Sequence, residues 1–486
     1  MALPDFSMIA PQLILIAMAL ILPGVYYLRS DERLLAGLSL AAIVAAIGSA
    51  AYLMYEGSYG DFAGIFVFDE FSALLILLFL VVAFLVVLTS LKHVEKDKHH
   101  GEYYSLLMVA TVGMMFVASA TDLISLFIGV ELTGITSYAL VAFRKNDPRA
   151  AEASVKYLII GGLSTAMTLY GFSLLYGMTG TVQLAGIAAA IAAAPSGMLL
   201  VAAVLVIAGL GFKISAAPFH MWAPDVYEGA STPVTVFLST GSKKMGFIAL
   251  FKIFLVCFVV GQAVMVQELQ MAFAILAAIT MTVGNVVAIS QTSIKRMLAY
   301  SSISQAGYLM IVLAVGTQFA LAGGIFHMIT HVFMKGGAFI VVAALAYVAL
   351  GEDLDAYKGL AKRAPFVAFA MMVFLFSLAG IPPLAGFSSK FVLFLSGLGS
   401  PTGGFDYQWA WLILIAVINS AISLYYYARV VKYMYVEEGE TQEKITLPWT
   451  YGVAIGIALV AVVVLGVGWS PVFELCEAAA SALWAL

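Results

Sequence analysis

Long stretches without charged residues follow one another along almost the whole chain. A helix needs about 20 apolar residues to cross a hydrocarbon core about 30 Å thick, and such stretches recur throughout the 486 residues. Only 10% of the residues are charged and 63% are hydrophobic, whereas a soluble domain carries about 25% charged residues. Because a helix satisfies its own backbone polar groups in lipid, the sequence predicts an all-α polytopic membrane protein.

The apolar stretches predict about fourteen transmembrane spans and a short amphipathic tail. The predicted limits are 8–28, 34–54, 70–91, 103–121, 123–143, 154–177, 197–217, 232–258, 268–290, 297–316, 319–349, 365–396, 409–434 and 449–470, with the tail at 471–486. The first span is preceded by Asp5 and by no basic segment. It is therefore predicted to be a retained helix and not a cleaved signal peptide.

The charges of the loops test this number of spans. The connections after spans 1, 3, 5, 9, 11 and 13 carry sixteen of the 23 basic residues: Arg29, Arg33, Lys92, Lys96, Lys98, Arg144, Lys145, Arg149, Lys295, Arg296, Lys358, Lys362, Arg363, Arg429, Lys432 and Lys444. The opposite loops and both termini carry no Lys or Arg, but only the acidic Asp5, Glu56, Asp61, Asp122, Glu268, Asp406, Glu474 and Glu477. By the positive-inside rule we expect cytoplasmic basic loops and both termini outside a cell membrane.

Seven lysines remain, and all of them fall inside predicted spans together with Glu131. The seven are Lys156, Lys213, Lys243, Lys244, Lys252, Lys335 and Lys390. A charge at the centre of a membrane costs roughly 2.5–3.5 kcal/mol, so these lysines are expected to face the bundle interior, water or each other. Snorkelling to the headgroups is an open alternative for Lys244 and Lys252.

Two of these lysines stand beside prolines. Lys213 precedes Pro218 near the end of span 7, and Lys390 follows Pro382 and Pro383 in span 12. Proline removes a backbone donor, and non-helical backbone at membrane depth survives only where it lines a polar cavity. Broken helices in corresponding places of two halves indicate an inverted-repeat transport fold, although simple packing kinks remain an alternative.

The spacing of the two breaks predicts the domain organisation. Spans 7 and 12 stand five helices apart, so spans 4–8 and 9–13 are interpreted as two inverted five-helix repeats. The expected parts are a three-helix segment at 1–100, a first half at 101–260, a second half at 261–436, and the last span with the tail at 437–486. We keep the terms first half and second half for these two ranges.

Span 11 carries His327, His331 and Lys335 at i, i+4 and i+8, which places them on one helical face. Two histidines at this spacing suit zinc, but zinc needs three or four ligands and the next group on this face is a cation. We expect a hydrogen-bonded relay that links the two halves. Buried core histidines without a function are the alternative.

Lysine and glutamate suit proton transfer inside a membrane. Desolvation lowers the pKa of a lysine and raises that of a glutamate, so both move toward neutral pH. Sodium sites favour clustered oxygen ligands, whereas these spans contain one glutamate and many amines. Protons are therefore the predicted cargo.

Other ligands find no support in the sequence. Cys257 and Cys476 share no metal-ligand spacing, and no Gly-rich phosphate loop follows a predicted strand. The net charge of −4 indicates no affinity for nucleic acid. We predict no metal and no cofactor on this chain.

Several strings resemble the N subunit of respiratory complex I, an antiporter-like subunit of proton-pumping NADH:quinone oxidoreductases with relatives in archaeal dehydrogenases that oxidise reduced F420. They are GVELTGITSYALVAF, KYLIIGGLSTAMTLYGFSLLYGMTGT, GFKISAAPFHMWAPDVYEGASTPVTVFLSTGSK, GNVVAISQTSIKRMLAYSSISQAGYLM, SLAGIPPLAGFSSKF and SAISLYYYARVVKYMY. The similarity extends from about Phe66 to Tyr435. The HMITHVFMK stretch of span 11 is more similar to the M and L subunits and to Mrp-type antiporters.

The resemblance implies fourteen helices with two inverted repeats, and it implies roles for five residues. Glu131 pairs with Lys213 of the broken seventh helix, Lys243 connects the halves, Lys156 is a modulatory lysine, and Lys390 lies at the exit. Protons then pass from Lys213 through Lys243 and the His327/His331 region to Lys390.

The expected function is proton translocation within a dehydrogenase that uses NADH or reduced F420 and a quinone or methanophenazine. FMN or FAD and iron–sulfur clusters are expected on other subunits, and subunits of the K, J, M and L types are the expected partners in the lipid bilayer. The alternatives are a subunit of an Mrp-type Na⁺/H⁺ antiporter and a structural subunit with a vestigial channel.

Overall fold

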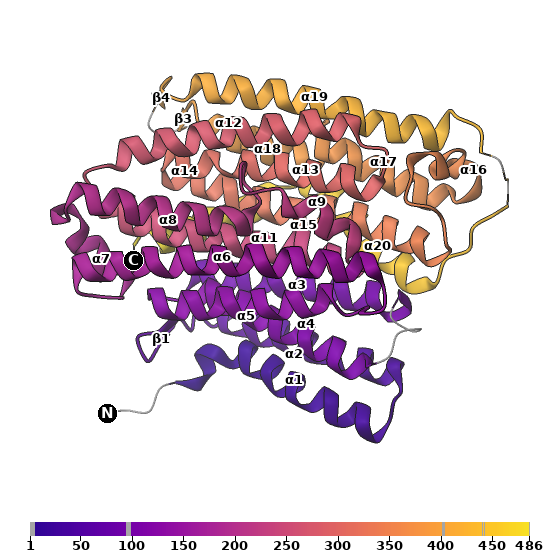
Figure 1. The fold of residues 1–486 in the computed structure, drawn as a ribbon, viewed down its shortest axis with the longest axis horizontal. Coiled ribbons are helices and arrows are strands. Elements are labelled where there is room, and N and C mark those ends of the chain that lie inside the picture. Colours follow the sequence, from indigo (N-terminus) through magenta and orange to yellow (C-terminus); the bar gives the residue numbers. More distant parts are fainter. Residues whose placement is uncertain (1–4, 94–98, 401–403, 440, 442, 486) are drawn as a thin grey trace.

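A computed structural model describes residues 5–93, 99–400, 404–439, 441 and 443–485. These residues are almost entirely helical, and the helices run side by side (Figure 1). Twelve helices in the described ranges are long and apolar enough to cross a membrane. The prediction of an all-α multi-pass membrane protein is therefore confirmed, whereas the count of fourteen spans stays a prediction. The basic loop residues Lys96 and Lys98 lie outside the described residues.

The N-terminal part of the chain contains five long helices and a small hairpin. The elements are the 3₁₀ helix η1 (Phe6–Ile9), α1 (Ala10–Leu28), α2 (Glu32–Tyr55), β1 (Gly60–Phe62), β2 (Phe66–Phe68), α3 (Glu70–His93), α4 (His100–Ser119) and α5 (Leu123–Val141). Asp31 and Asp122 begin α2 and α5, because each carboxylate accepts bonds from two free backbone N–H groups of the first turn.

The next elements extend to the middle of the chain. They are α6 (Pro148–Thr179), α7 (Leu184–Ala190), the 3₁₀ helix η2 (Ile191–Ala193), α8 (Ser196–Ile214), α9 (Trp222–Gly229), α10 (Thr232–Phe237), the π-helix η3 (Leu238–Ser242), α11 (Lys243–Leu250) and the π-helix η4 (Phe251–Val260). The predicted eighth span is thus helical throughout, but π-turns interrupt its α-helical phase on both sides of α11. π-Turns are rare and occur mostly at functional sites.

The remaining elements complete the fold. They are α12 (Val266–Ser290), α13 (Ile294–Leu309), α14 (Ile311–Val315), α15 (Gln318–Tyr347), the 3₁₀ helix η5 (Leu354–Tyr357), α16 (Leu360–Arg363), α17 (Pro365–Ala379), α18 (Ala385–Ser396), β3 (Gly399–Ser400), β4 (Gly404–Phe405), α19 (Ala410–Tyr435), α20 (Trp449–Val467) and α21 (Ser470–Trp484). The predicted amphipathic tail corresponds to α21, which packs on α15 and α3.

Predicted spans 7 and 12 are both interrupted near their prolines, as the sequence predicts. α8 ends at Ile214, Ser215 takes a left-handed conformation with φ 57°, and α9 begins seven residues further on at Trp222. α17 ends at Ala379, Gly380 has φ 93°, and α18 begins at Ala385. Only a residue without a Cβ adopts this second conformation without strain. The inverted-repeat relation of the two halves, and the domain limits, stay predictions.

Loops of the two charge classes lie at opposite ends of the helices. The β1–β2 hairpin, α7 and the β3–β4 hairpin are at one end in Figure 1, and α16 is at the other. Backbone bonds join loops within each end: Thr121 N donates to Ile65 O, and Ile294 N donates to Glu352 O. This arrangement agrees with the two loop sets that the basic residues define.

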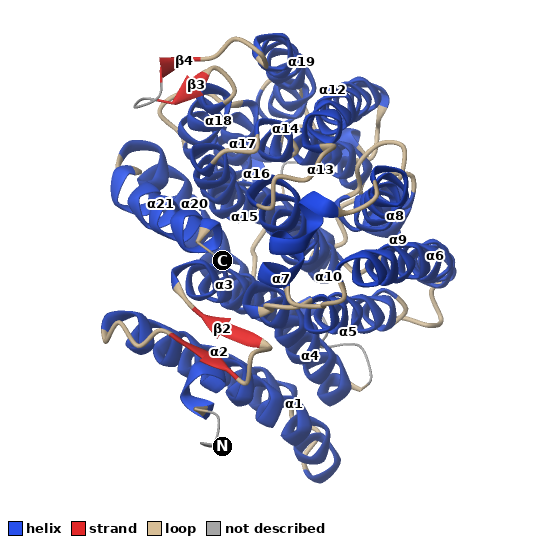
Figure 2. Ribbon diagram, turned by 90° about the vertical axis from the view of Figure 1, so that its left-hand side faces the viewer, coloured by secondary structure: helices blue, strands red, loops and turns tan. Residues whose placement is uncertain are grey.

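Among the candidate membrane spans of the described residues, the most enclosed are Ile294–Val315, formed by α13 and α14, and α15. Figure 2 looks along the helices and shows α15 in the interior, with α3, α13, α17, α18, α20 and α21 around it. Almost all residues of α15 are buried within the protein. Polar side chains on α13 and α15 therefore face other helices and not lipid.

Candidate functional site

Six of the seven predicted intramembrane lysines are buried in the protein. They are Lys213, Lys243, Lys244, Lys252, Lys335 and Lys390, each at most 3% exposed. Snorkelling of Lys244 and Lys252 is therefore wrong. Lys252 instead donates to the carbonyls of Ala118 and Ala120 at the end of α4, where the negative end of the helix dipole favours a cation.

Lys156 differs from the other six. Its side chain is 42% exposed, and its ammonium lies 2.8 Å from Glu152 and 2.7 Å from Asp225. The structure therefore places this lysine in an ion-pair network at the start of α6. It does not place it beside the buried amines.

Glu131 and Lys213 lie near the same face of α5 without touching. Glu131 Oε1 accepts a bond from Thr165 Oγ1 at 2.7 Å, and Lys213 Nζ donates to Tyr138 OH at 3.4 Å. These two residues, both in the described range 99–400, form no ion pair, so the structure differs here from the pairing that the resemblance implies. The carboxylate is held by Thr165 on α6, and the amine by Tyr138, two helical turns further along α5.

Gly134 makes the position of the Lys213 amine possible. It stands on α5 at i+3 from Glu131 and i−4 from Tyr138, so the three residues share a face. A Cβ on Gly134 would lie 2.6 Å from Lys213 Nζ. The absence of a side chain at Gly134 therefore lets the amine rest against α5.

Lys213 sits in the last turn of α8, and aromatic groups surround it. Its Nζ lies 5.3 Å from the centre of the Tyr138 ring and 5.8 Å from that of Phe212, distances at which a cation is attracted to a ring face. Trp222 Nε1 donates to the Phe212 carbonyl at 2.9 Å. The first residue of α9 thus bonds directly to the end of α8.

Lys243 connects to α13 and not to the histidines. Its Nζ donates to Ser302 Oγ at 3.0 Å and to Ser302 O at 3.3 Å, and it lies 5.6 Å from the Tyr227 ring. The predicted direct step from Lys243 to the histidines of α15 has no contact in this structure.

Lys244 takes the place next to the histidines. Its Nζ lies 2.7 Å from His331 Nδ1 and 3.3 Å from Ser239 O. An ammonium has donors only, so Nδ1 accepts this bond when the lysine is charged. This contact joins the first half to α15 in the second half.

His327 extends the line of contacts. The rings of His327 and His331 are 6.1 Å apart. His327 Nδ1 lies 3.0 Å from Ser389 Oγ on α18, and its Nε2 lies 3.2 Å from Gln305 Oε1 on α13. His331 Nε2 is buried and has no hydrogen-bond partner in the part of the chain that the structure describes. A water molecule is the usual partner of such an atom.

Lys390 caps the broken twelfth helix. Its Nζ donates to Leu378 O at 2.8 Å, to Ala379 O at 3.3 Å and to Ser420 Oγ at 3.0 Å. The helix break frees these two carbonyls, which have no partner in the next turn. Gln305 Nε2 also donates to Leu378 O, at 3.3 Å, so one carbonyl links Lys390 with the partner of His327.

Lys335 bonds to α13 and lies outside the line of contacts from Lys244 to Lys390. Its Nζ donates to Leu298 O at 2.8 Å and to Ser301 Oγ at 2.6 Å, and Ser301 in turn bonds to Tyr427. His327, His331 and Lys335 are all buried. Lys335 contacts Leu298 and Ser301 in the N-terminal part of α13, whereas His327 contacts Gln305 nearer the C-terminal end of that helix.

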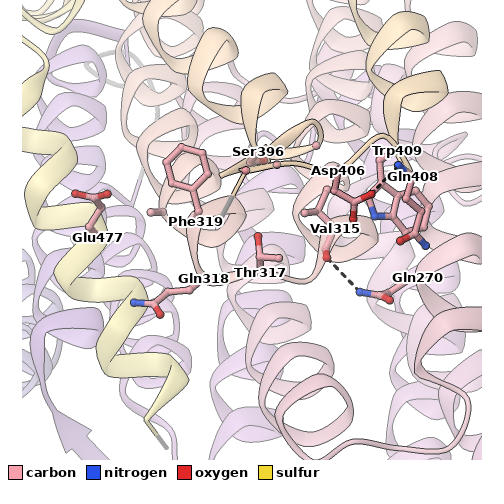
Figure 3. A pocket seen from close by; sticks show the side chains of 14 residues that line it. Gln270, Val315, Thr317, Gln318, Phe319, Ser396, Asp406, Gln408, Trp409 and Glu477 are labelled. Carbon is pink, nitrogen blue, oxygen red and sulfur yellow. Dashed lines mark hydrogen bonds between the residues drawn. The ribbon is translucent and has the colours of Figure 1, made fainter. Parts of the chain in front are cut away.

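Lys390 lines one cavity, and a second lies further along α18. The first, of about 490 Å³, is lined by Gly380, Lys390, Phe391, Phe394 and Ser420. Figure 3 shows the second, of about 620 Å³, which lies beside the β3–β4 hairpin; its polar lining includes Gln270, Thr317, Gln318, Asp406, Gln408 and Glu477. Ser396 at the end of α18 also lines it. Lys390 is six residues earlier on the same helix, a rise of about 9 Å.

Sequence reasoning missed several groups of this site. Ser302, Gln305 and Ser389 were not singled out, although Ser301, Ser302, Ser304 and Gln305 form a dense polar run inside an apolar span. That run was the signal that could have found them. The described ranges contain no group of three or more His, Cys, Asp or Glu side chains that could hold a metal ion.

Comparison with known proteins agrees with the fold. The chain is 43% identical to F(420)H(2) dehydrogenase subunit N of Methanosarcina mazei, and the match covers 99% of both chains. It is 42% identical to NADH-quinone oxidoreductase subunit N of Trichlorobacter lovleyi over 94% of this chain and 92% of that one. A chain of respiratory complex I from Thermus thermophilus has the same fold, with a TM-score of 0.80 and 30% identity over 96% of this chain and 98% of that one.

The match to a family profile points the same way. Residues 120–423, more than half of the chain, match the family described as "NADH:quinone oxidoreductase/Mrp antiporter, TM". This range contains Glu131 and all the buried amines and imidazoles described above. The predicted resemblance is confirmed, and the chain belongs to the NADH:quinone oxidoreductase/Mrp antiporter transmembrane family.

Proposed function

We propose that this chain translocates protons as a membrane-arm subunit of a complex I-like redox pump, without carrying a redox cofactor. The observation that carries the proposal is the contact line from Lys244 through His331, His327 and Gln305 to Lys390. It crosses from the first half to the second, and each of its groups is buried. Buried ionisable groups in a membrane are costly and mark ion pathways.

The proposed route begins at Glu131 and Lys213 in the first half. Lys243 and Lys244 pass the proton toward α15, with Lys244 rather than Lys243 as the donor to His331. His331 and His327 carry it along α15 toward Lys390. Gln305 holds the His327 ring and bonds to the Leu378 carbonyl that Lys390 also caps, and Lys335 tunes the charge beside them. Release occurs from Lys390 into the polar pocket of Figure 3.

Glu131 acts as the switch of this route. A carboxylate close to an ammonium stabilises the charged lysine, and its withdrawal makes the lysine release its proton. In the structure the two groups are separated, with Glu131 bonded to Thr165 and Lys213 to Tyr138. Movement of Glu131 from Thr165 to Lys213 and back is the proposed loading and unloading step.

The proposal extends to the surroundings of the chain. The basic loops lie in the cytoplasm and both termini outside a cell membrane, following the positive-inside rule. Subunits of the K, J, M and L types adjoin this chain, and FMN or FAD and the iron–sulfur clusters belong to other subunits. Electrons come from NADH or reduced F420 and reach a quinone or methanophenazine.

Two N-type oxidoreductase subunits match 99% and 94% of this chain, at 43% and 42% identity, and this favours the function over the Mrp-type antiporter. Mass spectrometry of the intact purified complex tests the choice. We expect flavin-binding and iron–sulfur subunits to co-purify with this chain. Co-purification with antiporter subunits alone, without flavin or iron–sulfur absorbance, would contradict it.

A direct test replaces Lys213 by Met and, separately, Glu131 by Gln. Inside-out vesicles carrying the whole complex are energised with the electron donor, and acidification is followed with a fluorescent dye beside electron transfer. We expect assembled complexes with strongly reduced pumping, whereas the exposed loop variant Lys444→Gln pumps normally. Unchanged pumping in both path variants would favour a vestigial channel.

A further inference from the structure

A second polar network lies at the end of the helices where α6 and α13 begin. Asp225 on α9 accepts from Lys156 on α6 at 2.7 Å and from Arg296 on α13 at 2.9 Å. The same Arg296 nitrogen lies 2.8 Å from Glu228, also on α9. We call these four residues, Lys156, Asp225, Glu228 and Arg296, the α9 clamp.

The α9 clamp joins parts of the chain that are far apart in sequence. α6 belongs to the first half, α13 to the second, and α9 is the second segment of the broken seventh helix. α9 packs against both α6 and α13. The two positive and two negative charges of these four side chains sum to zero. Such a network holds a fixed geometry better than an isolated exposed pair.

Asp225 of the clamp stays charged over the working pH range. Burial raises the pKa of Asp225, but its bonds to Lys156 and Arg296 outweigh burial and hold this pKa below its usual value. Because a free aspartate already ionises near pH 4, the Asp225 carboxylate is charged above about pH 5. A change in the pH profile of pumping then reports on a group elsewhere.

Trp222 connects the clamp to the buried amine. It lies three residues before Asp225 on α9, and its Nε1 donates to the carbonyl of Phe212, the residue before Lys213. Its ring stacks on Tyr157 with centres 4.6 Å apart, and Tyr157 contacts the ring of Tyr138, also at 4.6 Å. Tyr138 accepts the bond from Lys213. A shift of α9 therefore moves both the backbone and the hydroxyl that hold Lys213.

We propose that the α9 clamp positions Lys213: it fixes α9 between the two halves and, through Trp222, sets the distance between the Lys213 amine and Glu131. This inference rests on the proposed proton route. It gives Lys156 a positioning role instead of a place in the relay. Its ammonium lies between two carboxylates, and transfer of its proton would leave both without their partner. Through these contacts, a change in the distance between the two halves alters the position of Lys213, the first proton-loading site.

The test uses the whole complex with Asp225→Asn, Trp222→Phe and the double variant. Asparagine keeps the shape and loses the charge, and phenylalanine keeps a ring and loses the indole N–H. We expect each single variant to lower proton pumping on the order of tenfold, the cost typical of a misplaced reacting group, and to shift its pH optimum in the same direction. The double variant should match the single ones, because both interrupt one chain of contacts. Asp225→Glu should restore part of the loss.

Hydrogen exchange gives a second measurement that does not depend on activity. Asp225→Asn should speed amide exchange in the 215–222 segment of the purified complex. The surface pair Lys362–Glu438, 3.9 Å apart and largely exposed, offers the control: Glu438→Gln should leave exchange and pumping unchanged.

The outcomes separate this inference from the proposed function. If Lys213→Met stops pumping while Asp225→Asn and Trp222→Phe keep the pH optimum and exchange of the parent, the clamp is refuted and the route stands. If Lys213→Met pumps normally, the route itself fails. Additive effects in the double variant would show that Asp225 and Trp222 act independently, which also overturns the clamp.

Discussion

Lys244 Nζ lies 2.7 Å from His331 Nδ1, and both groups are buried. The lysine belongs to α11, between two π-turns, and the histidine to the buried central helix α15. This contact links a buried amine of the first half with a buried imidazole of the second half. If this contact is lost, the proposed route from Lys213 has no described contact with the histidines of α15.

We expect Lys244→Met to reduce proton pumping strongly while the complex still assembles. Methionine fills the space of the lysine side chain but leaves His331 Nδ1 without this partner. Because an unpaired buried polar atom costs stability, the amount of assembled complex is measured beside pumping. Acidification of inside-out vesicles measures the effect. Lys252→Met is the matched control, since Lys252 is equally buried but bonds only to carbonyls at the end of α4. Equal losses in both variants would remove Lys244 from the route.

Gly134→Ala should displace the amine of Lys213 without unfolding the protein. The new Cβ would lie 2.6 Å from Nζ, the mobile end of a long side chain, which can move aside. Helical Gly→Ala is otherwise favourable by about 0.5–1 kcal/mol. Pumping and thermal unfolding, measured together, should show lower pumping at unchanged or higher stability.

Gly162→Ala on α6 is the control for this variant, because no heavy atom lies within 4 Å of its Cβ position. It should stabilise the protein similarly and leave pumping as it is. Normal pumping in Gly134→Ala would mean that the exact place of the Lys213 amine does not matter.

Gln305→Leu should interrupt the route between His327 and Lys390. The side chain bonds to His327 Nε2 on one side and to Leu378 O on the other, and leucine fills the space without either bond. We expect pumping to fall on the order of tenfold, whereas Gln305→Glu, which can still accept from His327, retains more. Thr111→Ala removes a buried bond within one helix turn and should have no effect on pumping. A pumping rate in Gln305→Leu equal to that of Thr111→Ala would refute the link.

Proton pumping should not require sodium. The membrane interior offers amines and imidazoles, which cannot bind a sodium ion, and hard cations need several oxygen ligands. Vesicles washed free of Na⁺ and energised with the electron donor should therefore acidify at the same rate as vesicles with added Na⁺. A rate that rises with Na⁺ concentration would favour the antiporter alternative.

The sequence by itself determined the fold class, the burial of the charges and the two helix breaks. Uninterrupted apolar stretches leave a chain no soluble fold, and the prolines near Lys213 and Lys390 remove backbone donors and favour a break in the helix. The cost of a charge in lipid likewise requires most lysines to turn inward. The periodicity of span 11 also placed His327 and His331 on one face correctly, because α15 is an uninterrupted α-helix.

Only the tertiary structure decided which amine meets which partner. The family resemblance implied a step from Lys243 to the histidines, but the π-turn at Leu238–Ser242 adds a residue to a turn and rotates everything after it. Neighbouring residues of a helix point about 100° apart, so this rotation decides between Lys243 and Lys244. The exposure of Lys156 and the separation of Glu131 from Lys213 depend on how α5, α6 and α9 pack. Packing of helices that are distant in sequence leaves no periodic signal along the chain.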